Sequence, residues 1–168
     1  GILLTGINHT DVCRKQLIAA DIPIVEIWDL TPTPLDVVVG FSHEQIGRTV
    51  ADFLTSKKKY SHYGLVSATD KRALIRQKAF LEAMEGHGIS NVKVSNVPAP
   101  TSFKLGRQGL AQLIDNGFSN GAIFFSSDTL AQGGMAEAQS RGICIPDQLA
   151  FIGFGDQPYA AYTNPALT

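Results

Sequence analysis

Short apolar runs alternate with longer amphipathic stretches along almost the whole chain. The apolar runs have the length and β-branched content of buried strands, and the stretches between them have the length of helices. Strands are predicted at Ile2–Leu4, Ile24–Ile27, Val37–Phe41, Tyr63–Ser67, Val92–Asn96, Ala122–Phe125 and Ala150–Gly153. Helices are predicted at Asp11–Ala20, Glu44–Thr55, Lys71–Glu85, Phe103–Asp115 and Thr129–Ser140. This order is typical of an α/β fold with a mostly parallel sheet.

Polar turns follow several of the apolar runs. They lie at Phe41–His43, Ser67–Asp70, Ser126–Asp128 and Gly153–Asp156. If the runs are parallel strands, these turns lie at the carboxyl ends of the strands, where open α/β sheets bind ligands. The pattern therefore predicts a small-molecule pocket.

Polar residues and prolines between these segments predict where helices begin and where the first lobe ends. Asp70, Ser102 and Asp128 are expected to cap the helices that follow them, because short polar side chains accept bonds from free backbone N–H groups. The segment Asp29–Leu35 contains two prolines and is predicted to be a loop. We place the boundary just after it, so that residues 1–41 belong to a first lobe and residues 42–168 to a second.

Composition restricts the class of protein. With 168 residues, 44% of them hydrophobic, the chain can form one domain, or one lobe and part of another. Its formal net charge of -1 gives no basic field, so this segment alone is not expected to bind DNA tightly. Because Gly1–Leu4 already has the pattern of a buried strand, we expect the chain to be a fragment.

Cysteine usage and hydrophobic run length bear on the compartment. Cys13 and Cys144 have neither the spacing of a zinc site nor the number of a disulfide scaffold, which favours a reducing, cytoplasmic setting. No apolar run approaches the roughly 20 residues of a membrane span, and no signal-like core is seen. We expect no membrane association.

Enzyme motifs are incomplete. Gly153–Pro158 begins like a dinucleotide fingerprint but has proline at the third glycine position. His43–Gly47 resembles a zinc-protease helix but has glycine where the second histidine belongs. There is no nucleophile elbow and no phosphate-binding loop. We therefore expect no enzyme activity, cofactor or metal, and we interpret Lys57–Lys59 as solvated cations after a helix rather than a nucleic-acid patch.

Two groups of residues have a functional and a structural interpretation. Arg76 lies early in a predicted helix, where its planar fork can hold a carboxylate or vicinal hydroxyls. It can equally be a surface arginine that pairs with Glu82 or Asp70. Ser127 and Asp128 can bond backbone N–H groups, contact sugar hydroxyls, or do both at a helix N-terminus. The residues alone leave these alternatives open.

Three segments resemble the effector-binding core of LacI/GalR-type transcriptional regulators. They are Ile123–Met135, Arg141–Asp156 and Asn164–Thr168. Within that family, Asp29–Pro34 and Val39–Ser42 are most similar to gluconate-utilisation repressors. The resemblance implies a type I periplasmic-binding-protein-like fold with two lobes, the first incomplete here. It also implies a small-molecule effector between the lobes, a homodimer, and a separate helix-turn-helix head that binds operator DNA.

The resemblance also implies which side chains bind the effector. The family's Arg-x-x-Gly-Phe pattern is matched at Arg76, with Ala79 in place of the glycine. Ser42 and Gly155 stand where aspartates are usual, and Ser127 stands where asparagine is usual. Fewer carboxylates around a retained arginine favour a sugar acid such as gluconate or 6-phosphogluconate over a neutral sugar. The predicted ligand-binding residues are Arg76, Ser127, Asp128, Phe41, Ser42, His43, Ser102 and Asp156.

The family pattern also suggests where two copies meet. We expect a dimer contact at Gly133, Met135, Glu137, Arg141, Tyr159 and Tyr162, although the apolar members can equally be core. The leading interpretation is a cytoplasmic repressor whose effector shifts the arrangement of its lobes. An alternative is a secreted sugar-binding protein of a transport system with the same fold. A small α/β enzyme, such as a sugar-phosphate isomerase or dehydrogenase, is disfavoured by the incomplete motifs.

Overall fold

Two parallel sheets, one in each of two units, form the framework of the computed structural model, which describes residues 1–56 and 59–168. The first unit is Gly1–His43 and the second is Glu44–Thr168. Lys57 and Lys58, two of the three lysines interpreted above as solvated cations, lie outside the described residues.

The first unit contains a three-stranded sheet with the order β1-β2-β3. Its elements are β1 (Ile2–Thr5), α1 (Asp11–Ala19), β2 (Ile24–Ile27) and β3 (Val37–Val39). Thr10 caps α1 by accepting a bond from the backbone N–H of Cys13. Glu26, at the centre of β2, is fully buried, and its carboxylate accepts bonds from His9 and from the backbone N–H of Leu35.

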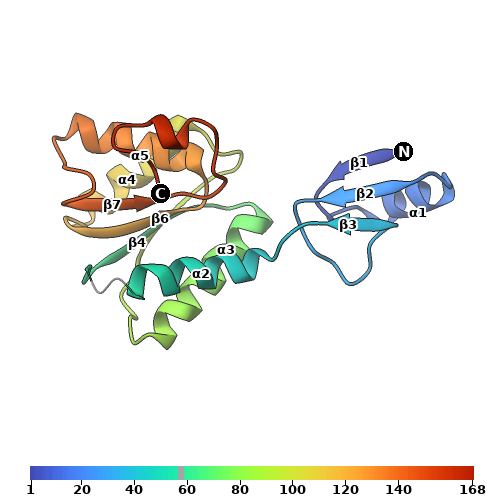
Figure 1. Cartoon of the computed structure of the whole chain (residues 1–168), viewed down its shortest axis with the longest axis horizontal. Coiled ribbons are helices and arrows are strands. Elements are labelled where there is room, and N and C mark those ends of the chain that lie inside the picture. The colour runs from blue at the N-terminus through green and yellow to red at the C-terminus, as the bar shows by residue number, and fades with distance from the viewer. Residues whose placement is uncertain (57–58) are drawn as a thin grey trace. The chain divides into compact units, whose positions relative to one another are not determined.

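The second unit contains a four-stranded parallel sheet with the order β5-β4-β6-β7. The strands are β4 (Tyr63–Ala68), β5 (Lys93–Val97), β6 (Gly121–Phe125) and β7 (Leu149–Ile152). The helices are α2 (His43–Ser56), α3 (Lys71–Gly86), α4 (Phe103–Asp115) and α5 (Asp128–Ser140), and a short 3-10 helix follows at Ala160–Tyr162. Helices α2 and α3 cover one face of this sheet, and α4 and α5 cover the other (Figure 1).

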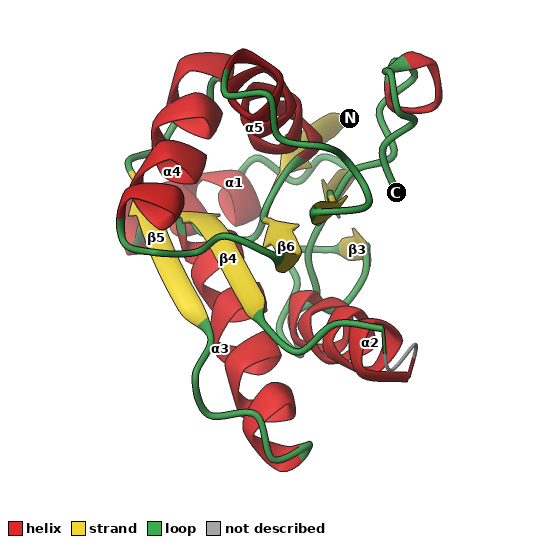
Figure 2. Cartoon of the chain, turned by 90° about the vertical axis from the view of Figure 1, so that its left-hand side faces the viewer, coloured by secondary structure: helices red, strands yellow, loops and turns green. Residues whose placement is uncertain are grey.

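Two apolar cores lie on the two faces of the second sheet, because successive strand residues point to opposite sides. In β6, Ala122 and Phe124 pack toward α2 and α3, whereas Ile123 and Phe125 pack toward α4 and α5. All of β4 and β6 is buried, as expected for central strands of a sheet covered on both faces. Figure 2 shows β4 and β5 side by side, with α4 beside them.

The α/β class with parallel sheets flanked by helices is confirmed, and the predicted strands and helices are found with small differences at their ends. The largest is at β3, which ends at Val39 rather than Phe41. The neighbouring strand β2 ends at Ile27, and the next residue, Trp28, has a left-handed backbone conformation with a φ of 73°. Gly40 then lies directly against the backbone of Asp29, where a Cβ would come within 2.1 Å of the Asp29 carbonyl oxygen.

One cap prediction is wrong. Asp70 and Ser102 cap α3 and α4 as expected, accepting bonds from Ala73 and Leu105. At α5 the cap is Ser127, one residue earlier than predicted, and its hydroxyl accepts a bond from the backbone N–H of Leu130. Asp128 is the first helical residue, and its carboxylate is used elsewhere, as described below.

Candidate functional site

Arg76 is the centre of a polar cluster at the carboxyl ends of the strands of the second unit. It lies in the second turn of α3, the helix that follows β4, and only 5% of its surface is exposed. Its Nη2 donates a bond of 2.9 Å to the carbonyl oxygen of Ser126, the first residue after β6. The guanidinium also stacks on the ring of Phe154, with 4.1 Å between Cζ and the ring centroid. Phe154 follows β7, so the cluster joins three strand ends.

The burial of Arg76 decides one of the alternatives left by the sequence. A surface arginine pairing with Glu82 does not describe it, because Glu82 pairs with Arg48 and Lys78 instead. Burial lowers the pKa of Arg76 to about 10, while the charge of Asp70 acts against this effect and that of Arg72 adds to it. Arg76 is therefore cationic at neutral pH, and its charge lies in a medium that strengthens its attraction for an anion.

The two serines after β6 have different tasks. The hydroxyl of Ser126 accepts a bond from the backbone N–H of Ala68 and so joins the ends of β4 and β6. Ser127 caps α5 and is half-buried. The N-terminus of α5 thus opens at the same edge of the sheet as Arg76, and a helix N-terminus favours negative charge.

Asp128 fixes the turn that carries Phe154. Its side chain is buried, with 3% exposed, and Oδ2 accepts a bond of 2.7 Å from the backbone N–H of Gln157. Its own N–H donates to the carbonyl oxygen of Phe154. Oδ1 lies against Gly153, where a Cβ would come within 2.2 Å of it. The structure therefore gives this carboxylate a structural partner, and its contact with an effector stays a prediction.

The remaining predicted residues of the second unit lie at helix and turn positions. Ser102 caps α4 after β5 and is half-buried. Asp156 is exposed, has a φ of 48°, and follows Gly155 in the turn after β7. Effector contacts of Ser102 and Asp156 stay predictions.

Phe41 and His43 form a small aromatic group in the first unit. The ring of Phe41 packs edge-on against both Trp28 and His43, with centroid distances of 5.7 and 5.1 Å. His43 is buried, and its Nε2 donates to the carbonyl oxygen of Trp28. Ser42 lies between the two rings in sequence and is half-buried. Trp28, which is 43% exposed just after β2, is not among the residues predicted from the sequence.

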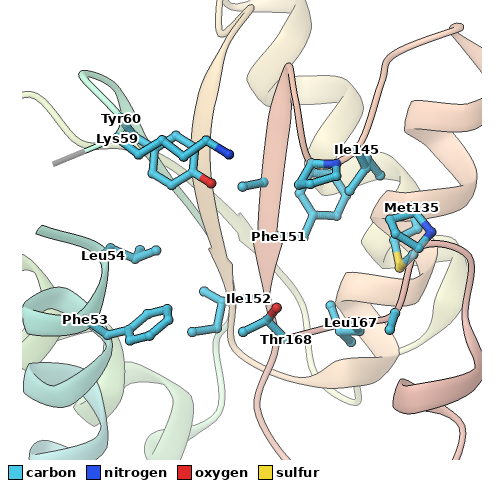
Figure 3. A pocket seen from close by; sticks show the side chains of 14 residues that line it. Phe53, Leu54, Lys59, Tyr60, Met135, Ile145, Phe151, Ile152, Leu167 and Thr168 are labelled. Carbon is cyan, nitrogen blue, oxygen red and sulfur yellow. The ribbon is translucent and has the colours of Figure 1, made fainter. Parts of the chain in front are cut away.

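An apolar cavity of about 370 Å³, shown in Figure 3, shares no lining residue with this polar cluster. It runs along β7, between α2 on one side and the segment that ends at Thr168 on the other. Phe53, Leu54, Phe151, Ile152 and Leu167 line it, together with Tyr60 and Lys59. Among its lining residues within 1–56 and 59–168, Lys59 is the one cation. The lining is mostly apolar and offers little to hold a polar ligand, so we assign the candidate site to the Arg76 cluster instead.

The residues predicted for a dimer contact divide into buried and exposed members. Gly133 and Met135 are buried inside the second unit. Glu137 accepts bonds from Arg107 of α4 and from Arg141, the residue that follows its own helix. Tyr159 lies 3.4 Å from the hydroxyl of Thr129, and Tyr162 is 86% exposed. The dimer itself stays a prediction.

Within residues 1–56 and 59–168, no three His, Cys, Asp or Glu side chains are grouped closely enough to hold a metal ion. None of the helices described there has the length and apolar character required to cross a bilayer.

The chain is similar in sequence to bacterial transcriptional regulators. It is 32% identical over its whole length to the "HTH-type transcriptional regulator GntR" of Pseudomonas aeruginosa and covers 49% of that protein. It is 29% identical over 99% of its length to the "HTH-type transcriptional regulator IdnR" of Escherichia coli K12, covering 50% of it. The chain thus spans about half the length of these curated relatives, whose names describe regulators rather than enzymes.

Solved structures agree with this similarity. A transcription regulator GntR from Chromobacterium violaceum superposes with a TM-score of 0.87 at 30% identity, over the whole chain and 62% of that structure. A LacI family transcriptional regulator from Silicibacter pomeroyi gives 0.86 at 25% identity, over 98% of the chain and 62% of that structure. Residues 51–168 match the family model described as a periplasmic binding protein-like domain. The chain therefore belongs to the periplasmic binding protein-like family, and it is similar to the corresponding part of GntR and LacI family transcriptional regulators.

Proposed function

We propose that this chain is the effector-sensing core of a cytoplasmic transcriptional repressor and that its effector is a sugar acid such as gluconate or 6-phosphogluconate. The observation that carries the proposal is Arg76, a buried cation held between Ser126 and Phe154 at the carboxyl edge of the second sheet. A guanidinium in such a setting binds a carboxylate through two parallel bonds. The regulators named GntR and IdnR among the relatives support the same class of protein.

The charge balance of the strand ends favours an anion over a neutral sugar. Ser42 and Gly155 stand where the family usually has aspartates, so two carboxylates are missing from these turns. The carboxylate of Asp128 accepts a bond from the backbone N–H of Gln157, and this N–H dipole offsets part of its repulsion of an anion. An anionic effector therefore meets less like-charge repulsion and gains Arg76 as a partner.

Regulation requires that the effector bind two arrangements of the core with different affinity. In the proposed repressor, a separate helix-turn-helix head binds operator DNA, and the core changes the spacing of two such heads in a homodimer. The net charge of -1 agrees with DNA binding by another segment.

The proposed dimer residues at or near the surface are Tyr162, Tyr159, Glu137 and Arg141. Sedimentation of Tyr162→Asp tests this point, and an unchanged dimer would remove Tyr162 from the contact.

Calorimetric titration with gluconate, 6-phosphogluconate and glucose tests the effector. We expect a sugar acid to bind and glucose to bind much more weakly. Arg76→Ala is expected to weaken gluconate binding at least about 30-fold, because a charged hydrogen-bonding partner is worth ~2 kcal/mol or more. Lys78→Ala is the matched control, since Lys78 lies on the same helix with its side chain 78% exposed. Equal binding of glucose and gluconate would overturn the sugar-acid proposal.

A further inference from the structure

We propose that Phe154 is a positioning residue of this site, and that its ring fixes the plane in which Arg76 meets the anionic group of the effector. This inference rests on the proposed function, and it adds a determinant of anion selectivity that does not itself carry charge. Phe154 and Arg76 are 78 positions apart in the sequence and meet only through the fold.

Two contacts at different parts of the guanidinium determine its orientation. Phe154 covers its face at 4.1 Å, and the carbonyl oxygen of Ser126 accepts a bond of 2.9 Å at its edge. A ring against the face of a planar group opposes rotation about a hydrogen bond at its edge. The cation–π attraction is strongest where water is excluded, as it is around buried Arg76.

The turn that carries Phe154 is itself fixed from both sides. Asp128 donates its backbone N–H to the carbonyl oxygen of Phe154 and accepts the N–H of Gln157 on its carboxylate. On the strand side, the N–H of Gly153 donates a bond of 2.7 Å to the carbonyl oxygen of Thr168. The direction of the ring is therefore set by the backbone of the turn.

Both glycines that flank Phe154 are required by this geometry. Gly153 has no room for a side chain because Oδ1 of Asp128 occupies the space. Gly155 has a φ of 130°, a conformation that residues with a Cβ rarely adopt. The Gly-Phe-Gly sequence is thus explained without a dinucleotide: it places one aromatic ring on one buried arginine.

The orientation of the guanidinium affects the binding of a ligand only if that ligand forms bonds in the plane of the guanidinium. This difference makes the site selective. A carboxylate needs the guanidinium fork in its plane for two parallel bonds, whereas a neutral polyol of the same length does not. Loss of the ring therefore weakens binding of the anion more than binding of the polyol.

Calorimetry with gluconate and the neutral polyol glucitol tests this difference. Phe154→Leu is expected to weaken gluconate binding about ten-fold, which lies within the range of a cation–π contact. Phe154→Tyr keeps the ring and is expected to stay within about two-fold. Phe151→Leu is the control, because Phe151 lies in β7, the strand that leads into the turn of Phe154, but packs on Phe125 rather than on the arginine. An equal loss for gluconate and glucitol in Phe154→Leu would overturn the proposal.

Nitrogen-labelled NMR of the full chain supplies a readout that needs no ligand. A guanidinium above a ring is shielded, so the Nε–Hε resonance of Arg76 is expected to move downfield in Phe154→Leu and to stay in Phe151→Leu and Phe154→Tyr. An unmoved resonance in Phe154→Leu would refute the positioning role. If the wild-type chain binds no sugar acid, the proposed effector fails while this resonance still decides whether Phe154 positions Arg76.

Discussion

A Cβ added to Gly133 of α5 would lie 2.9 Å from the Cα of Gly106 in α4, because the two helices are in backbone contact at that point. At Gly106 itself, a Cβ would come within 2.1 Å of the carbonyl oxygen of Leu130. The close approach packs α4 and α5 against each other on one face of the second sheet. Glycine is thus needed in both helices despite its low helix propensity.

Alanine at either glycine should therefore separate the helices. Gly106→Ala and Gly133→Ala are each expected to lower the free energy of unfolding by about 3 kcal/mol, as over-packing of a filled core does. Urea denaturation followed by circular dichroism measures this. Gly86→Ala is the control, because a Cβ there meets nothing within 4 Å. Equal midpoints for all three variants would contradict the helix contact described here.

Gly47 connects the packing of α2 to the candidate site. A Cβ at Gly47 would lie 2.3 Å from the backbone carbonyl oxygen of Arg76 and 2.9 Å from the backbone N–H nitrogen of Phe80. Gly47→Ala should push α3 away and lower stability by about 2 kcal/mol. It should also weaken gluconate binding, because the backbone of Arg76 moves. Thr49→Ala, at an exposed position of the same helix, should change neither titration nor melting.

Glu26 is expected to hold the first unit together through its two bonds. Glu26→Leu removes the acceptor for His9 and for the backbone N–H of Leu35, leaving two partly buried donors without this acceptor. A loss of roughly 1–3 kcal/mol is expected. Hydrogen exchange of the β2 amides measures it within the first unit. Glu44→Leu breaks an exposed pair with Arg48 and should cost about 0.5 kcal/mol or less, so equal effects would argue against the role of Glu26.

Glu137 should make stability depend on pH in the acidic range. Bonds from Arg141 and Arg107 hold its pKa below the ordinary value of 4.5. A carboxyl whose folded pKa is lowered adds stability that is present above 4.5 and is lost as the pH falls through the lower folded value. Glu137→Gln should flatten this part of the profile of melting temperature against pH. Arg107→Ala should flatten it in part, and a profile unchanged by both variants would contradict the assignment.

The sequence predicted the helices and strands well because their formation depends mostly on residues close to one another in the chain. Alternation within Ala122–Phe125 is a property of one strand, and Asp70 and Ser102 cap their helices through bonds three residues away. The choice between Ser127 and Asp128 as the cap was different. Both residues can cap a helix, and the bond from Gln157 to Asp128, 29 positions away, decided in favour of Ser127.

By itself, then, the sequence determined the α/β class, the order of strands and helices, and the edge of the sheet at which polar residues gather. It also indicated Arg76 through its family resemblance. Only the tertiary structure decided that this arginine is buried, that Phe154 covers it, and that Trp28 is exposed at the end of β2. The spacing of apolar residues shows which face of a helix or strand packs against the core. Which residues meet across elements depends on the register and packing of segments far apart in the chain, and one sequence carries no direct signal for that.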